Sequence, residues 1–93
     1  MRAIWKGTVL AESNDTVIVE GNHYFPAESL NKQCFRGSPH STRCPWKGTA
    51  SYFDVVVAGE VNPNAAWLYA NPSEAAAEIR GRVAFWHGVE VVA

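Results

Sequence analysis

The chain has 93 residues, of which 47% are hydrophobic and 18% are charged, so it can build one folded core and is too apolar to be intrinsically disordered. A net charge of −1 and a pI near 6.3 argue against the strongly basic class of proteins that bind genomic nucleic acid. No apolar run is long enough to span a membrane, so we expect one domain over residues 1–93 with no membrane partner.

The first part of the chain predicts a series of short strands. Residues 3–10 and 16–20 are rich in strand-forming side chains and are separated by the turn residues 12–15. A third strand over residues 23–25 stops at a proline, after which residues 26–30 can form one helical turn. We therefore expect this half to form an antiparallel meander.

The middle of the chain contains a polar segment followed by the strongest predicted strand. Residues 36–43 are polar and include glycine and proline, which predicts a loop of the kind that often carries function. Residues 49–58 have apolar side chains on both faces, as expected of a central strand. A turn over residues 58–60 leads into a further extended segment, on which Trp67 and Tyr69 share one face.

One short helix is predicted near residues 72–80. Asn71 suits the N-cap, Pro72 the first helical position, and Gly81 the residue that ends a helix. Residues 83–86 and 89–92 flank a turn and predict a C-terminal hairpin. Many short strands with one short helix indicate a mainly β fold of compact antiparallel sheets, arranged like a sandwich or barrel.

The two cysteines, Cys34 and Cys44, are too few for a disulfide scaffold and lack the C-x-x-C spacing of a structural zinc site. The first six residues contain no signal-peptide core, so we expect a cytoplasmic, reducing location in which both thiols are free. A metal shared by Cys34, His40 and Cys44 would lack a fourth ligand. The sequence therefore predicts neither a metal site nor a cofactor.

Cys44 is nevertheless a weak candidate for a catalytic residue. Arg43 and Lys47 could lower the pKa of its thiol, and His40 could act as the base. The alternative is a packed and inert thiol, because free cysteines are among the most buried residues in proteins.

A basic, aromatic segment in the middle of the chain predicts an anion site. No acidic residue lies between Glu28 and Asp54, whereas this interval contains four basic ones: Lys32, Arg36, Arg43 and Lys47. Such a segment favours a small anionic ligand, although a solvated surface with ordinary charges is the alternative. Lys47 and Arg43 would hold the anion. Aromatic side chains would line the pocket walls, unless they form the core instead: Trp46, Tyr52, Trp67 and Tyr69.

Four segments resemble the family catalogued as domain of unknown function 427, and they cover nearly the whole chain in the family's order: residues 22–26, 44–52, 65–69 and 81–86. The resemblance implies a compact β domain of the β-tent type without zinc cysteines. It adds Ser38 to the predicted ligand-binding residues. The family's motif positions fall on Ser38, Cys44, Pro45, Lys47, Gly48, Tyr52, Trp67, Tyr69 and Pro72. The chain departs from the family pattern at Cys34, Pro39 and Ala70.

The family also carries the label nucleotidyltransferase-like, which the carboxylates of this chain do not support. Two-metal nucleotidyl transfer needs clustered acidic ligands, and the only aspartates are Asp15 and Asp54. The leading hypothesis is therefore a protein that binds a small anion between residues 38–47 and the Trp67–Tyr69 segment. The alternatives are an enzyme, either nucleotidyltransferase-like or dependent on Cys44, and a protein-interaction module. The sequence leaves the oligomeric state open between monomer and homodimer.

Overall fold

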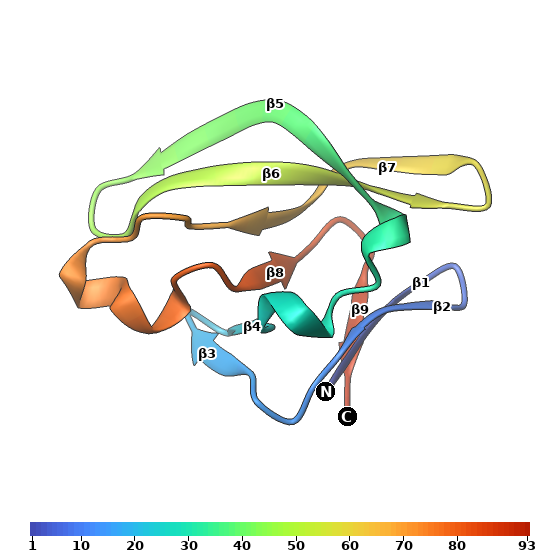
Figure 1. Cartoon of the computed structure of the whole chain (residues 1–93), viewed down its shortest axis with the longest axis horizontal. Coiled ribbons are helices and arrows are strands. Elements are labelled where there is room, and N and C mark those ends of the chain that lie inside the picture. The colour runs from blue at the N-terminus through green and yellow to red at the C-terminus, as the bar shows by residue number, and fades with distance from the viewer.

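The computed structural model describes all residues, 1–93, and its strands form three antiparallel sheets (Figure 1). The largest sheet has the order β5-β6-β7-β8, with the bounds Phe35–Cys44, Gly48–Val57, Glu60–Leu68 and Val83–Phe85. The second has the order β2-β1-β9, with the bounds Thr8–Glu12, Arg2–Trp5 and Glu90–Val92. The third is the hairpin of β3 (Val17–Val19) and β4 (Asn22–Tyr24). The predicted mainly β, antiparallel fold class is confirmed.

Three short 3₁₀ helices connect the strands: η1 (Ala27–Ser29), η2 (Lys32–Cys34) and η3 (Glu74–Ile79). The predicted helix near residues 72–80 is present as η3, but it consists of two 3₁₀ turns with non-helical dihedral angles at Ala76. The residue before it is Ser73, so the prediction of Asn71 as N-cap is wrong. A segment of six residues is too short to propagate a regular α-helix. None of the helices has the length and apolar character needed to cross a membrane.

The largest sheet separates two hydrophobic cores, because neighbouring residues of a strand point to opposite faces. The first core lies against the β2-β1-β9 sheet and contains Ala3, Leu10, Ala11, Phe25, Cys34, Val55, Val57, Ala65, Ala66, Val83 and Phe85. The second core lies against β4 and η3 and contains Tyr24, Ala50, Tyr52, Trp67, Tyr69, Ala76, Ile79 and Ala84. The radius of gyration of 12.4 Å is that of a compact chain of this length.

Strands β5, β6 and β7 are irregular at the same level of the sheet. The register shifts between Gly37 and Ser41 on β5 and between Phe53 and Val55 on β6. The bulges lie on the neighbours of β6: residues 38–40 of β5 lie opposite Tyr52 alone, and residues 63–65 of β7 lie opposite Asp54 alone. The carboxylate of Asp54 accepts the backbone N–H of Asn64 on β7 at 3.0 Å. β6 itself has no inserted residue: Ala50 and Tyr52 point into the second core, and Val55 and Val57 point into the first, so the two cores on opposite sides explain its apolar character on both faces.

The prediction of a loop over residues 36–43 is wrong, because this segment forms most of strand β5 (Figure 1). β5 is an edge strand that pairs only with β6. An edge strand tolerates polar residues, and it tolerates Pro39 in a bulge where no ladder hydrogen bond is needed. Polar composition therefore reflects the position of this strand in the sheet.

Two further predictions about connectivity are corrected. The segment over residues 3–10, predicted as one strand, forms a hairpin with its turn at Lys6 and Gly7, whose φ angles are 49° and 74°. β3 and β4 belong to another sheet, so the expected meander is absent. The predicted C-terminal hairpin is absent too, because β8 pairs with β7 and β9 pairs with β1. These strands find partners that lie far away in the sequence, which local patterns do not encode.

Candidate functional site

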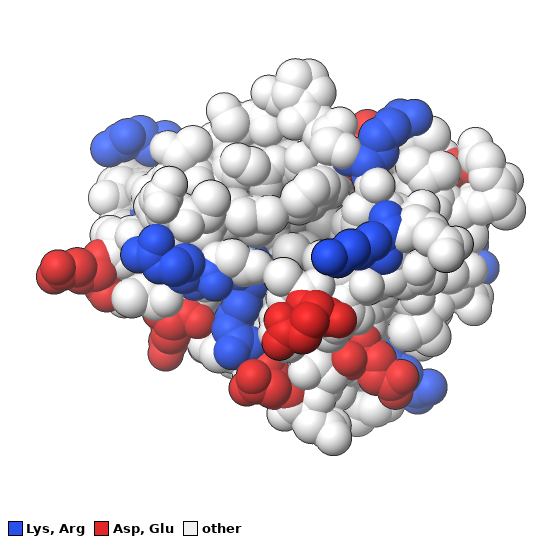
Figure 2. Space-filling view, in the orientation of Figure 1, with Lys and Arg blue, Asp and Glu red and all other residues white.

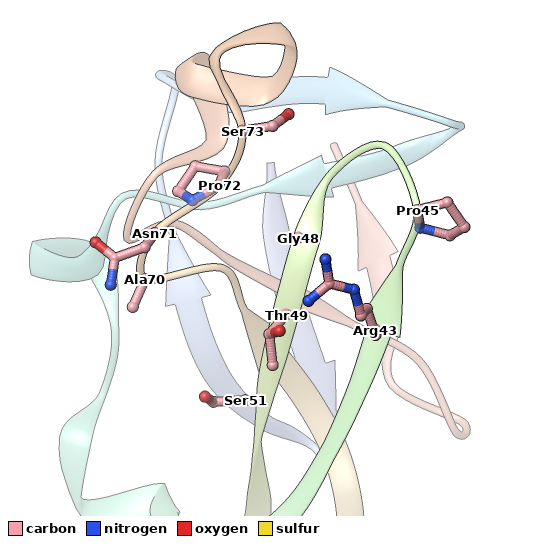
Figure 3. Close-up of a pocket in the computed structure, with 9 residues that line it drawn as sticks. All are labelled: Arg43, Pro45, Gly48, Thr49, Ser51, Ala70, Asn71, Pro72 and Ser73. Carbon is pink, nitrogen blue, oxygen red and sulfur yellow. The ribbon is translucent and has the colours of Figure 1, made fainter.

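The largest surface groove, with a volume of about 570 Å³, lies between the end of the β5–β6 hairpin and the segment that follows β7 (Figure 3). Most of the residues that line it are small or polar: Arg43, Pro45, Gly48, Thr49, Ser51, Ala70, Asn71, Pro72 and Ser73. Two smaller grooves have volumes of about 220 and 320 Å³. We describe the largest one as the groove and residues 69–73 as the strap.

The groove exists because the strap leaves the sheet and then returns to it. β6 and β7 are paired up to Ser51 and Leu68, where β7 ends. The strap comes back at Ser73, whose backbone N–H donates to the carbonyl of Lys47 at 2.9 Å and whose hydroxyl donates to the carbonyl of Trp46 at 2.5 Å. These two bonds tie the strap to the β5–β6 turn and define one end of the groove.

Gly48 lies against the strap in a backbone conformation that favours glycine. Its φ angle of +114° lies in the region that side-chain-bearing residues rarely adopt. A Cβ atom at this position would lie 3.4 Å from the carbonyl oxygen of Asn71 and 3.7 Å from the Cα atom of Pro72. The positive φ angle thus explains why the motif over residues 44–52 has a glycine at position 48.

Arg43 supplies a positive charge to the groove, and the protein itself leaves that charge unpaired. It lies opposite Thr49 in the β5–β6 register, and its guanidinium is directed toward Gly48 and Thr49 (Figure 3). No ion pair or side-chain hydrogen bond involves it, and no acidic residue lines the groove. Of the eight lysines and arginines, Lys32 is the other one without such a partner.

Two of the four basic residues in the predicted basic segment form ion pairs within the protein. Arg36 pairs with Asp54 at 3.3 Å, and Lys47 pairs with Glu20. On the face drawn in Figure 2, basic side chains occupy the upper and middle parts, and most of the acidic ones gather below them. Charges of both signs therefore lie close together on that face. The guanidinium of Arg43 differs from most of the basic groups because it has no partner within the protein.

Lys47 lies outside the groove and is buried, with 9% of its side chain exposed. Its ammonium group lies 5.4 Å from the ring centroid of Trp46 and 5.5 Å from that of Tyr69. It donates a hydrogen bond to the carboxylate of Glu20 in the β3–β4 turn, and the indole N–H of Trp46 donates to the same carboxylate at 3.4 Å. The β5–β6 turn is thereby fastened to the β3–β4 hairpin.

The pKa values of this cluster follow from its contacts. Burial has the largest single effect and would lower the pKa of Lys47, but the hydrogen bond to Glu20 and the charge interactions with Tyr24, Tyr69 and Glu20 together outweigh it, so the pKa of Lys47 is raised. The same hydrogen bond lowers the pKa of Glu20. Burial raises the pKa of Tyr69. Lys47 thus stays charged and already has an anionic partner within the protein, so its role as a ligand-binding residue stays a prediction.

The predicted aromatic wall residues do not line the groove. Tyr52, Trp67 and Tyr69 belong to the second core and are 7%, 9% and 5% exposed. Trp67 packs edge to face on Tyr24 and donates its indole N–H to the hydroxyl of that tyrosine at 3.2 Å. Trp46 is half-exposed but points to Glu20 instead. Of the predicted ligand-binding residues, Arg43 is the one that lines the groove.

Ser38 and Cys44 also lie away from the groove lining. The hydroxyl of Ser38, in the β5 bulge, donates to the side-chain oxygen of Asn64 at 2.6 Å and accepts the backbone N–H of His40 at 3.1 Å. Cys44 is half-buried against the second core. The His40 ring packs on Tyr52 with ring centroids 4.7 Å apart, and no hydrogen bond joins it to Cys44. Both cysteines are free thiols, and Cys34 is buried.

The sequence reasoning missed the strap and the two hydroxyl residues of β6, Thr49 and Ser51. The sequence predicts that residues 71–73 start a helix and that both hydroxyl residues lie on a strand, and it assigns neither segment a role in binding. The available signal was the combination of a glycine at the start of β6 with an Asn-Pro-Ser turn directly after β7. The groove forms where the strap meets the β5–β6 turn, and the hydrogen bonds that join them, from Ser73 to Trp46 and Lys47, connect residues far apart in the chain.

One family model matches the entire chain, residues 1–93. It is named NTP_transf_9 and described as Domain of unknown function (DUF427). The match confirms the resemblance found in the sequence, and its description assigns no activity. No curated protein matches the chain.

Proposed function

Because the chain belongs to the DUF427 family, whose description names no activity, we propose a function from the groove itself: the protein binds a small anionic ligand there, with Arg43 as the main contact. The observation that carries this proposal is the guanidinium of Arg43, which is unpaired in a groove that has no acidic residue. An unpaired cation of this kind attracts an anion and raises its local concentration.

The composition and size of the groove support the same proposal. A guanidinium group presents N–H donors in a planar fork that matches carboxylate and phosphate oxygens. The exposed hydroxyls of Thr49 and Ser51 add donors on the neighbouring strand. A volume of about 570 Å³ falls within the range of small-molecule sites. The ligand is therefore a small molecule or a short segment with one anionic group.

Lys47 and its aromatic neighbours have an indirect role in this proposal. The ion pair with Glu20 holds the β5–β6 turn, and the turn carries both Pro45 and Gly48 of the groove lining. Replacing Lys47 would thus disturb the shape of the groove without removing a direct ligand contact.

Titration calorimetry with inorganic phosphate, sulfate and citrate tests the proposal on the wild-type protein, Arg43→Gln and Lys32→Gln. Loss of a charged hydrogen bond costs about 1.5–3 kcal/mol, so Arg43→Gln should weaken binding by at least about tenfold. Lys32→Gln is the matched control, because it removes an equally unpaired charge outside the groove. The proposal fails if none of these anions binds the wild-type protein, or if both variants lose the same affinity.

A further inference from the structure

Strand β6 keeps an unpaired backbone edge inside the groove. The first step of the argument comes from β8, where Val83 and Phe25 exchange two backbone hydrogen bonds of 2.9 and 2.8 Å. The backbone groups of Val83 therefore point toward Phe25 and away from β7. Because successive residues of a strand point their N–H and C=O groups to opposite sides, those of Ala84 point to its partner Trp67 on β7.

The same alternation continues from β7 to β6. Since Trp67 points to β8, the next residue, Leu68, points to its β6 partner, Ser51. The hydrogen bond from Trp86 N–H to the carbonyl of Ala65 at 3.0 Å supports this alternation. Ala65 lies two residues before Trp67, so its backbone groups point to the same side, toward β8. The backbone groups of Ser51 thus face β7, and those of Thr49, two residues earlier, face the same side.

At Thr49, however, β7 has ended and the strap has moved away. No backbone hydrogen bond joins the strap to Thr49, and the strap next bonds to this hairpin at Lys47, through Ser73. Thr49 therefore directs an unpaired N–H donor and an unpaired C=O acceptor into the groove. A residue added alongside a strand would satisfy this pair of groups, as in peptide recognition by strand addition.

We propose that the ligand of the groove is an N-acylated α-amino acid, either free or as the last residue of a peptide. This inference rests on the proposed function. The amide N–H of the ligand donates to the carbonyl of Thr49, one oxygen of its carboxylate accepts the N–H of Thr49, and the carboxylate also accepts hydrogen bonds from Arg43. Arg43 lies directly opposite Thr49 on β5, and its side chain reaches across toward it (Figure 3).

The charges of the groove favour a neutral amide over the free ammonium group of an unmodified amino acid. An ammonium group at Thr49 would lie near the guanidinium of Arg43, and no lining carboxylate would compensate its charge. A fully deprotonated inorganic anion such as sulfate would satisfy Arg43 but would leave the carbonyl of Thr49 without a donor. The acylated nitrogen next to a carboxylate is thus the chemistry that fits all three groups.

The test compares ligands that differ in one group. N-acetylglycine has the amide N–H, acetoxyacetate replaces that N–H with an ester oxygen at nearly the same size, and glycine carries the ammonium group. Two-dimensional amide NMR titrations of the ¹⁵N-labelled protein measure the affinities and follow the Thr49 amide. We expect N-acetylglycine to bind at least fivefold more tightly than the other two, to shift the Thr49 resonance and to slow hydrogen exchange at Thr49.

Protein variants separate the backbone contact from the shape of the groove. Thr49→Pro removes the N–H that faces the groove and should abolish the preference for N-acetylglycine, whereas Lys32→Gln, a change outside the groove, should retain it. If Thr49→Pro does not fold, the comparison of N-acetylglycine with acetoxyacetate on the wild-type protein decides alone. An acetylated tetrapeptide ending in glycine distinguishes the source: tighter binding than N-acetylglycine indicates a peptide C-terminus, and weaker binding indicates a free acyl amino acid.

Equal affinity for N-acetylglycine and acetoxyacetate would overturn this inference. So would anion binding that depends on Arg43 without any perturbation of the Thr49 amide. Both results would leave the proposed anion site standing. Failure of every anion to bind would instead remove the proposed function itself.

Discussion

Replacing Gly48 with alanine should destabilise the protein and distort the groove. The backbone of Gly48 has a φ angle of +114°, and the added Cβ atom would meet the carbonyl oxygen of Asn71 at 3.4 Å and the Cα atom of Pro72 at 3.7 Å. Both distances are those of ordinary van der Waals contact, so the cost comes from the backbone conformation, in which an alanine is strained. The cost is therefore expected to appear in the free energy of unfolding.

A residue held in a disfavoured backbone region costs about 1–3 kcal/mol. For a domain of this size, each kcal/mol lowers the melting temperature by about 4–8 °C, which places the expected fall for Gly48→Ala between about 5 and 20 °C. The matched control is Gly37→Ala on the neighbouring strand. Gly37 has no positive φ angle, and no atom lies within 4 Å of the position of its added Cβ. We expect this control to melt close to the wild-type temperature.

Thermal unfolding followed by circular dichroism measures both variants, and phosphate titration measures the groove. Gly48→Ala should bind the anion more weakly than Gly37→Ala does, because the strap forms one wall of the groove. Equal melting temperatures for the two variants would refute the claim that the backbone conformation at position 48 requires glycine.

Three further predictions concern the cores and the ion pair. Ile79→Ala should lower the free energy of unfolding by about 2–5 kcal/mol in urea titrations, because Ile79 is fully buried in the second core. Its control, Ile18→Ala at a 61% exposed position, should change the free energy of unfolding by less than about 0.5 kcal/mol. Similar values for the two variants would contradict the assignment of the core. Lys47 lowers the pKa of Glu20 below its ordinary value of 4.5, so the stability from this pair is present above about pH 4.5 and is lost as the pH falls through the lowered folded-state pKa. Acidification from about pH 6 to about pH 3 should therefore destabilise the wild type more than it destabilises Glu20→Gln. Parallel profiles of unfolding free energy against pH would show that the pair contributes nothing. Buried Cys34 should resist iodoacetamide in the folded protein and react only on unfolding, as mass spectrometry of labelled peptides can show; rapid native labelling would contradict its burial.

Local chemistry explains which strands and turns the sequence predicts correctly. The run of β-branched and aromatic residues over 49–58 favours a strand in any context, and the turn after it contains Ala58 and Gly59 with φ angles of 50° and 79°. Gly81 ends η3 with a φ angle of 68°. These features depend on a few neighbouring residues, so they can be predicted without knowledge of the rest of the fold.

Strand β5 shows where local reasoning fails. Its polar residues indicate a loop when they are considered alone, yet pairing with β6 along one side is enough to make the segment extended. The bulge of β7 has the same character, because residues 63–65 lie opposite Asp54 alone and nothing within β7 marks the two residues in excess. Both depend on partners in other strands, and alternation within one segment carries no information about them.

The sequence alone established the family, the mainly β character and the presence of a basic segment without acidic residues over 29–53. It could not establish which of those basic groups is free, since each partner comes from elsewhere in the chain. Glu20, from the β3–β4 turn, neutralises Lys47, and Asp54 neutralises Arg36, which leaves Arg43 in the groove. Charge is a property of individual residues, whereas pairing and burial are properties of residues brought together by folding, and the candidate site depends on the latter.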